Sequence, residues 1–140
     1  MINKKEIINI LTEISLPKEE YMLVFGSSMV LHGIKKKTND IDIACSKKLL
    51  EQIKKDSDFT LGLNNWYQSK KYPIEISDIF YDATQKEMIK NIPISKIDYI
   101  ISLKKQLNRE KDIRDLGLIG DYLKRNDLLR YEKELYAKGY

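Results

Sequence analysis

The stretch from Tyr21 to Ser46 constrains the fold of this chain more than any other part of the sequence. It opens with the apolar run Tyr21–Phe25, stops at Gly26-Ser27-Ser28, and continues through a short, mostly apolar segment to Gly33. A basic run follows, and the stretch closes with Asp40-Ile41-Asp42-Ile43 and three further residues. Hydrophobic period and turn residues predict a strand, a tight turn, a helix, a glycine stop, a loop and a second strand.

The two acids of the second predicted strand, Asp40 and Asp42, are expected to share a face because side chains alternate along a strand. Each residue rises about 3.3 Å, so the two backbone positions lie about 6–7 Å apart. Ile41 and Ile43 then point the other way, into a core. Two carboxylates on one face can bind a hard divalent ion or a close pair of ions, and Mg²⁺ prefers a few carboxylate oxygens together with substrate phosphates.

The Gly-Ser-Ser segment is expected to form the turn between strand and helix. Gly26 lets the backbone approach a ligand with no side chain in the way. Ser27 and Ser28 are expected to open the helix, where free N–H groups and the helix dipole favour a phosphate. Capping is the commoner role of a serine at such a position, so a purely structural role stays open for Ser27.

In this order and spacing, the motif resembles the active-site signature of the DNA polymerase beta-type nucleotidyltransferase superfamily. The matching segments are Gly26-Ser27, Leu31-His32-Gly33 and Thr38-Asn39-Asp40-Ile41-Asp42. The string is most similar to small bacterial nucleotidyltransferases that include the AbiEii-type toxins. The resemblance implies an α/β (α+β) fold, in which a small mixed sheet is flanked by helices and followed by a helical C-terminal part.

The resemblance also implies an activity, the Mg²⁺-dependent transfer of a nucleoside monophosphate from an NTP to an acceptor hydroxyl. Asp40 and Asp42 would hold the metal, and the segment Gly26-Ser27-Ser28 would hold the triphosphate. Members of this family often carry an arginine just before the Thr-x-Asp-x-Asp string, where this chain has lysines ending at Lys37. Lys37 would therefore supply positive charge near the nucleotide without the bidentate grip of an arginine.

A third carboxylate is expected on a neighbouring strand, because the superfamily uses one as general base and as a further metal ligand. Glu75 stands between Ile74 and Ile76, where such a residue is expected, and the preceding proline indicates an edge position or a strand start. Asp78 competes for this role, and Asp82 is a weaker candidate.

The segment around Lys104 resembles the second block of the family. Leu103-Lys104 is followed by Arg109, Lys111-Asp112 and Asp115. Lys104 lies in the apolar stripe of a predicted helix, so it either extends to solvent or reaches the triphosphate. The resemblance favours phosphate contact for Lys104 and structural roles for Asp112 and Asp115.

The chain is expected to form one domain over residues 1–140, with a sheet core at about 21–80 and C-terminal helices at about 95–137. Periodicity predicts helices over 3–14 and 46–56, a strand face at Phe59, Leu61 and Leu63, and a polar helix over 83–90. Ser95 is predicted to cap the following helix, with Asp98 completing a capping box. Trp66 and Tyr67 are expected to pack on the sheet rather than to offer a face to a base.

Composition narrows the class of protein further. The net charge of +4 suits an anionic substrate such as a nucleotide or RNA. The single cysteine, Cys45, fits a reducing cytoplasm and is expected to be a buried small hydrophobe. A structural role is expected for His32. Because it is the single histidine of the sequence, His-rich metal sites are excluded. No apolar window of membrane-spanning length and no secretion signal is present, so a cytoplasmic protein without a membrane partner is expected.

The expected partners follow from the resemblance. They are an NTP, Mg²⁺ at a two-metal site with Mn²⁺ as the alternative ion, and an acceptor that is RNA, a protein or a small molecule. If the chain is a toxin, a cognate antitoxin is a further partner. A noncatalytic relative that binds a nucleotide or a partner protein remains the alternative, because the chain is short for this superfamily.

Overall fold

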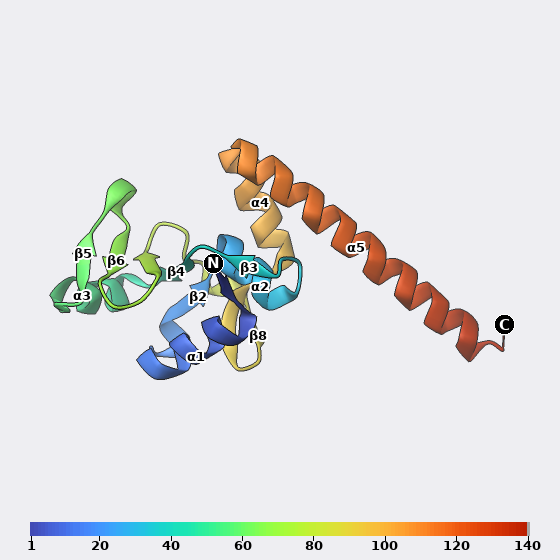
Figure 1. Ribbon diagram of the computed structural model, residues 1–140, viewed down its shortest axis with the longest axis horizontal. Helices are drawn as coiled ribbons and strands as arrows, with labels where there is room; N and C mark the ends of the chain where they lie inside the picture. Colours follow the sequence, from blue (N-terminus) through green and yellow to red (C-terminus); the bar gives the residue numbers. More distant parts are fainter. Residues whose placement is uncertain (140) are drawn as a thin grey trace. The chain divides into compact units, whose positions relative to one another are not determined.

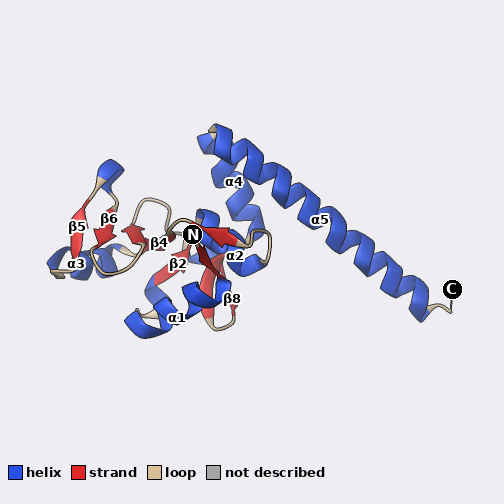
Figure 2. Cartoon of the chain, viewed as in Figure 1, coloured by secondary structure: helices blue, strands red, loops and turns tan. Residues whose placement is uncertain are grey.

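A computed structural model describes residues 1–139, which divide into two compact units, Met1–Ile100 and the described part of 101–140. The first contains a seven-stranded mixed sheet with the strand order β5-β6-β7-β4-β2-β9-β8 (Figures 1 and 2). The central strand β4 is antiparallel to β2 and parallel to β7. The predicted α+β architecture, a mixed sheet with flanking helices, is therefore confirmed.

The elements of the first unit have these bounds. The strands of the large sheet are β2 (Tyr21–Leu23), β4 (Ile41–Cys45), β5 (Phe59–Leu61), β6 (Tyr67–Ser69), β7 (Ile74–Ser77), β8 (Lys86–Ile89) and β9 (Ile92–Ser95). The helices are α1 (Lys4–Ile14), α2 (Phe25–His32) and α3 (Lys47–Lys55), with short 3-10 turns at Lys18–Glu20, Leu63–Asn65 and Ala83–Gln85. A separate antiparallel pair joins β1 (Ile2–Asn3) to β3 (Lys37–Thr38).

Alternation along β4 divides the core into two layers. Ile41, Ile43 and Cys45 are completely buried in the larger cluster, which also receives apolar side chains from α1 and α3. Ala44 lies in a smaller cluster with Met22 of β2 and with half-buried aromatic side chains. Asp42 is half-buried between its two buried isoleucine neighbours. The predicted arrangement, with isoleucines in the core and an acid on the opposite face, is confirmed for Asp42.

Two residues singled out in the sequence have structural roles. The Nε2 atom of His32 lies 2.8 Å from the carbonyl oxygen of Ser95, a hydrogen bond that ties the end of α2 to β9. Cys45 is 0% exposed, and burial, followed by the charges of Asp78 and Glu20, raises the pKa of its thiol to about 12. A thiol in this environment stays protonated at neutral pH and is no nucleophile.

Two long helices follow the last strand of the sheet. The boundary between the two units falls within α4 (Ile97–Leu107), and α5 (Glu110–Ala137) is a single helix of 28 residues. Within residues 1–139, no helix combines the length and the apolar character needed to cross a membrane.

Several predicted boundaries were wrong. The first strand ends at Leu23, and Phe25 already belongs to α2. Leu63 lies in a 3-10 turn, 83% exposed, and not in a strand. The predicted polar helix over 83–90 is a short turn followed by the strand β8, and Ser95 belongs to β9 and is not a helix cap. The sheet thus extends to residue 95.

The hairpin of β8 and β9 explains the largest of these errors. Its two-residue turn is formed by Lys90 and Asn91, both with positive φ (51° and 64°), as a tight hairpin turn of the primed type requires. Lys-Asn is not a strong turn signal of this kind. In addition, β8 is an edge strand, and its two middle residues, Glu87 and Met88, are exposed as they would be on a surface helix.

Candidate nucleotide-transfer site

The register of two parallel strands brings two carboxylates together. Asp42 of β4 pairs with Glu75 of β7, and neighbouring strands lie about 4.8 Å apart. Paired residues of adjacent strands point to the same face, and both side chains are half-buried. Asp40 lies one residue before the start of β4 and is also half-buried. Asp42 and Glu75 therefore lie side by side near the beginning of β4 and β7, and Asp40 lies just before β4.

Of the three acids considered for the third carboxylate, Glu75 is the one that the register places beside Asp42. Its Oε1 accepts a hydrogen bond of 3.0 Å from Nε2 of Gln68 on β6, which orients the carboxylate. Asp78 follows the end of β7. Asp82 accepts hydrogen bonds from the backbone and hydroxyl of Thr84, and so holds the turn before β8.

The turn after β2 is fixed directly to Asp42. The backbone N–H of Val24 donates to the carbonyl oxygen of Asp42 at 2.9 Å. The hydroxyl of Ser27 lies 2.9 Å from the Val24 carbonyl and 3.2 Å from the Asp42 carbonyl, and it accepts from the Asp42 N–H at 3.2 Å. Gly26, Ser27 and Ser28 belong to α2, so the separate turn predicted at these residues is wrong. The N-terminal end of α2 and the acid-bearing strand form one hydrogen-bonded unit.

Neither serine caps the helix. Val24 is the N-cap residue, without a side-chain hydrogen bond, and Ser27 is the third residue of α2. The hydroxyl of Ser28 donates to the carbonyl oxygen of Phe25 at 2.7 Å. Both serine side chains are 0% exposed. The capping interpretation of Ser27 is wrong, and its hydroxyl instead holds two segments together.

Gly26 is required by its surroundings. A Cβ atom at this position would lie 2.6 Å from Oγ1 of Thr38 on β3, closer than non-bonded atoms can approach. The absence of a side chain therefore serves close packing of the loop against the turn. Lys37, next to Thr38 in β3, is exposed and stands opposite Asn3 of β1. One of the lysines predicted to lie near the nucleotide is therefore one residue from the contact with Gly26.

Phe25 stabilises the turn at a cost in backbone conformation. Its φ of 54° lies in the left-handed region, which costs a bulky residue about 1–3 kcal/mol. The ring packs edge-on against Phe80, with centroids 5.2 Å apart, and at a tilt against Trp66 at 6.4 Å. The expected packing of Trp66 against the sheet is confirmed, since it joins the cluster around Met22.

Lys104 belongs to the second unit and is bound there by acids. Its Nζ lies 2.9 Å from Asp115 and 3.3 Å from Asp112, and its side chain is only 2% exposed. The guanidinium of Arg109 also donates to Asp112, at 2.6 and 3.1 Å. The alternative in which Lys104 extends to solvent is wrong, and the expected structural roles of Asp112 and Asp115 are supported.

No three His, Cys, Asp or Glu side chains within residues 1–139 gather in an arrangement that could hold a metal ion. The pair of Asp42 and Glu75 nevertheless offers hard oxygen donors on one face. Mg²⁺ commonly takes one or two carboxylates and completes its shell with substrate phosphates and water. The donor set therefore fits a metal that arrives with a nucleotide.

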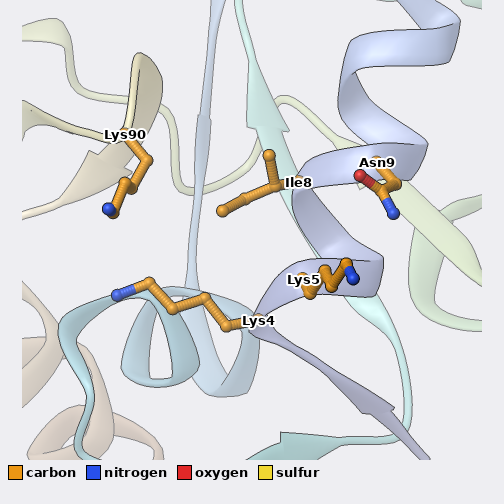
Figure 3. Close-up of a pocket in the computed structure, with 5 residues that line it drawn as sticks. All are labelled: Lys4, Lys5, Ile8, Asn9 and Lys90. Carbon is orange, nitrogen blue, oxygen red and sulfur yellow. The ribbon is translucent and has the colours of Figure 1, made fainter.

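A separate depression of about 340 Å³ lies away from these residues (Figure 3). It is lined by Lys4, Lys5, Ile8, Asn9 and Lys90. Figure 3 shows the amino groups of Lys4 and Lys90 on the same side of Ile8. None of the predicted site residues contributes to its lining.

Sequence reasoning missed three residues that shape the site. Thr38 belongs to the motif string, so a position close to Asp40 and Asp42 could have been inferred for it. Its contact with Gly26, however, depends on the pairing of β1 and β3. Gln68 reaches Glu75 through the pairing of β6 and β7, for which the sequence carries no local signal. The positive φ of Phe25 is equally unsignalled.

Comparison with known proteins bears on the fold. No protein-family profile and no curated protein matches the sequence. Among solved structures, a protein from Thermotoga maritima provisionally described as a nucleotidyltransferase superposes with a TM-score of 0.60, covering 89% of this chain and 96% of its own, at 13% identity. This similarity shows that the chain has a fold of the nucleotidyltransferase type. At 13% identity it shows the fold alone.

Two proteins of Helicobacter pylori are similar over part of their length. JHP933 gives a TM-score of 0.48 at 20% identity, and a provisionally described nucleotidyltransferase gives 0.43 at 19%. The matches cover 73% and 74% of this chain but only 54% and 59% of the two proteins. Scores below 0.5 support no conclusion about this chain.

Proposed function

We propose that this protein is a Mg²⁺-dependent nucleotidyltransferase that moves a nucleoside monophosphate from an NTP to an acceptor hydroxyl. The observation that carries the proposal is the pairing of Asp42 with Glu75, beside the start of α2, where the hydroxyl of Ser27 is hydrogen-bonded to the backbone of Asp42. An acid pair next to a strand–helix turn suits the transfer of a group that carries phosphates, and the shared fold supports this assignment.

Each part of the site has a role in the proposal. The backbone N–H groups at the start of α2, which have no acceptor within the helix, would receive the triphosphate together with the positive end of the helix dipole. Asp42 and Glu75, with Asp40, would hold the metal, which when bound would neutralise charge on the reacting phosphates. Glu75, oriented by Gln68, takes the proton of the acceptor hydroxyl. Positioning and charge stabilisation supply most of the rate enhancement.

The two lysines contribute differently. Lys37 is exposed close to the turn and attracts the anionic nucleotide. The phosphate contact expected for Lys104 stays a prediction, because its ammonium group already pairs with Asp112 and Asp115. Those pairs favour a structural role.

The proposal extends to the acceptor and to the biological role. The acceptor hydroxyl belongs to RNA, to a protein or to a small molecule. A toxin role, with a cognate antitoxin as partner, rests on the motif string between Gly26 and Asp42. Growth arrest on expression, relieved by Asp42→Ala, supports this role, whereas normal growth counts against the toxin and leaves the enzyme standing.

A noncatalytic nucleotide-binding or partner-binding protein is the second candidate. The observation that favours it is that residues 1–139 contain no group of three side chains arranged to hold a metal. An active enzyme must therefore draw more of its metal ligands from the substrate.

Incubation of the purified protein with labelled NTPs, Mg²⁺, and total cellular RNA or protein distinguishes the two candidates. We expect labelled product in the presence of Mg²⁺, its loss on addition of a chelator, and its recovery when excess Mg²⁺ or Mn²⁺ is restored. Calorimetry with NTP completes the test. Binding that is indifferent to Mg²⁺, with no transfer to any acceptor, identifies the noncatalytic protein.

A further inference from the structure

The C-terminal half of α5 exposes a set of large apolar side chains. Leu128, Leu129, Tyr131 and Tyr136 are 58, 55, 57 and 80% exposed, and no described residue of α5 beyond Ile119 is buried. Figure 1 shows this segment as the orange-to-red end of one continuous helix. Exposed apolar groups of this size mark an interaction surface when they gather on one side.

Helical spacing does gather them. Successive residues rotate by about 100° around a helix axis, so Leu128, Tyr131 and Leu135 share a side, and Leu129 and Tyr136 lie next to them. We refer to these five residues as the apolar face. The opposite side of the same turns is entirely polar, and consists of Asn126, Asp127, Arg130, Lys133 and Glu134. A helix of this pattern is built to be covered along one side.

Four charged residues of the segment 120–137 lie on the same side of the helix as the apolar face, namely Asp121, Lys124, Arg125 and Glu132. Arg125 and Glu132 are the two that stand between its apolar residues. Glu132 has Leu128, Leu129, Leu135 and Tyr136 as its neighbours three and four positions away, and Arg125 lies seven positions before it. Both are exposed, and neither forms an ion pair within residues 1–139, in contrast to Arg130, whose guanidinium pairs with Asp127 on the polar side at 2.5 Å. A charge inside an apolar contact surface requires a countercharge from the partner.

We propose that a second copy of this chain covers the apolar face, with the two helices antiparallel about a two-fold axis near Leu128 and Leu129. This arrangement places Arg125 beside Glu132 of the partner subunit, and symmetry repeats the pair. A parallel arrangement would instead bring like charges together. The segment 120–137 is about 27 Å long, so the contact is small and the dimer dissociates on dilution.

Charge reversal tests this pairing. In sedimentation velocity over a wide concentration range, the wild-type chain forms a concentration-dependent dimer. Arg125→Glu and Glu132→Arg, each alone, place like charges opposite one another twice and raise the dissociation constant at least about tenfold. An equimolar mixture of these two variants restores opposite charges at both positions and therefore dimerises. The double variant, carrying both changes, dimerises like the wild type.

Matched controls make the result specific. Arg130→Glu reverses a charge on the polar side of the same turns and leaves the dimer unchanged, and circular dichroism checks that every variant keeps its helix. A wild-type chain that stays monomeric at all concentrations overturns the proposal and assigns the face to a different partner. A dimer unaffected by the single reversals, or a mixture that fails to associate, overturns the antiparallel pairing.

Discussion

Asp42→Asn lowers kcat/KM for nucleotidyl transfer at least about a thousandfold, because it removes the charge through which the site is proposed to hold its metal. The substitution preserves the size of the side chain and leaves the backbone hydrogen bonds between residue 42 and Ser27 in place. The fold should therefore survive, which an unchanged unfolding midpoint verifies. Steady-state transfer assays with labelled NTP measure the loss.

A companion pair of variants identifies the general base. Glu75→Gln keeps the hydrogen-bonding size of the side chain beside Gln68 but cannot accept a proton, and should lower kcat by about 10²–10⁴. Asp78→Asn is the matched control and should stay within a factor of a few, because Asp78 lies beyond the end of β7. Equal losses in the two variants, or activity kept in Glu75→Gln, would contradict the assignment of the general base.

For the metal ligand, wild-type activity in Asp42→Asn would contradict the proposed role of Asp42.

Asp112→Ala is expected to lower the free energy of unfolding by about 3–5 kcal/mol, because it breaks a buried ion pair from one side. The ammonium of Lys104, 2% exposed, loses one of its two carboxylates, and Arg109 loses two hydrogen bonds from its guanidinium and one from its backbone N–H. Asp127→Ala removes the carboxylate of the exposed pair with Arg130 and should cost less than about 1 kcal/mol. Urea unfolding of the two variants gives the comparison, and similar costs would contradict it.

The same cluster predicts a pH dependence. Burial of Asp112 acts to raise its pKa, but the hydrogen bonds from Arg109 and the charge of Lys104 outweigh it and hold the pKa at about 2, below the ordinary 3.8. A depressed folded-state pKa contributes stability above pH 3.8, and this contribution is lost as the pH falls toward 2. The loss amounts to about 2 kcal/mol. Asp112→Asn should flatten the dependence in this range, as urea unfolding at several pH values would show.

The parts of the site carried by local sequence were predictable. An apolar run, a Gly-Ser stop and alternating acids and isoleucines describe consecutive residues. The structure places Asp42 in a strand as that pattern implies, whereas Gly26-Ser27-Ser28 belongs to α2 and not to a turn before it. Glu75 could be proposed from its apolar neighbours, but its place beside Asp42 depends on which strands pair. Strand order is a property of the whole chain, and no short segment encodes it.

Other features escaped prediction because surrounding structure overrides local preference. The composition of the segment 83–90 favours a surface helix, yet pairing with β9 makes Lys86–Ile89 an edge strand. Phe25 was assigned to a strand by its apolar character, whereas the packing of its ring on Phe80 holds it in a left-handed conformation. Ser95 was predicted as a cap from its spacing to Asp98, but β9 continues through it.

The hydroxyl of Ser27 is hydrogen-bonded to the carbonyl oxygen and to the N–H group of Asp42. These two bonds hold the ends of the segment 27–42 together, so that the residues between them form a closed loop. The separation between the start of α2 and Asp42 is consequently set by these hydrogen bonds, and not by the number of residues that connect the two. Exposed positions within this loop, such as Lys36, can therefore accept inserted residues while Ser27 and Asp42 keep their distance from each other. Variation in the length of this loop could change what the protein recognises without disturbing the chemistry that we propose.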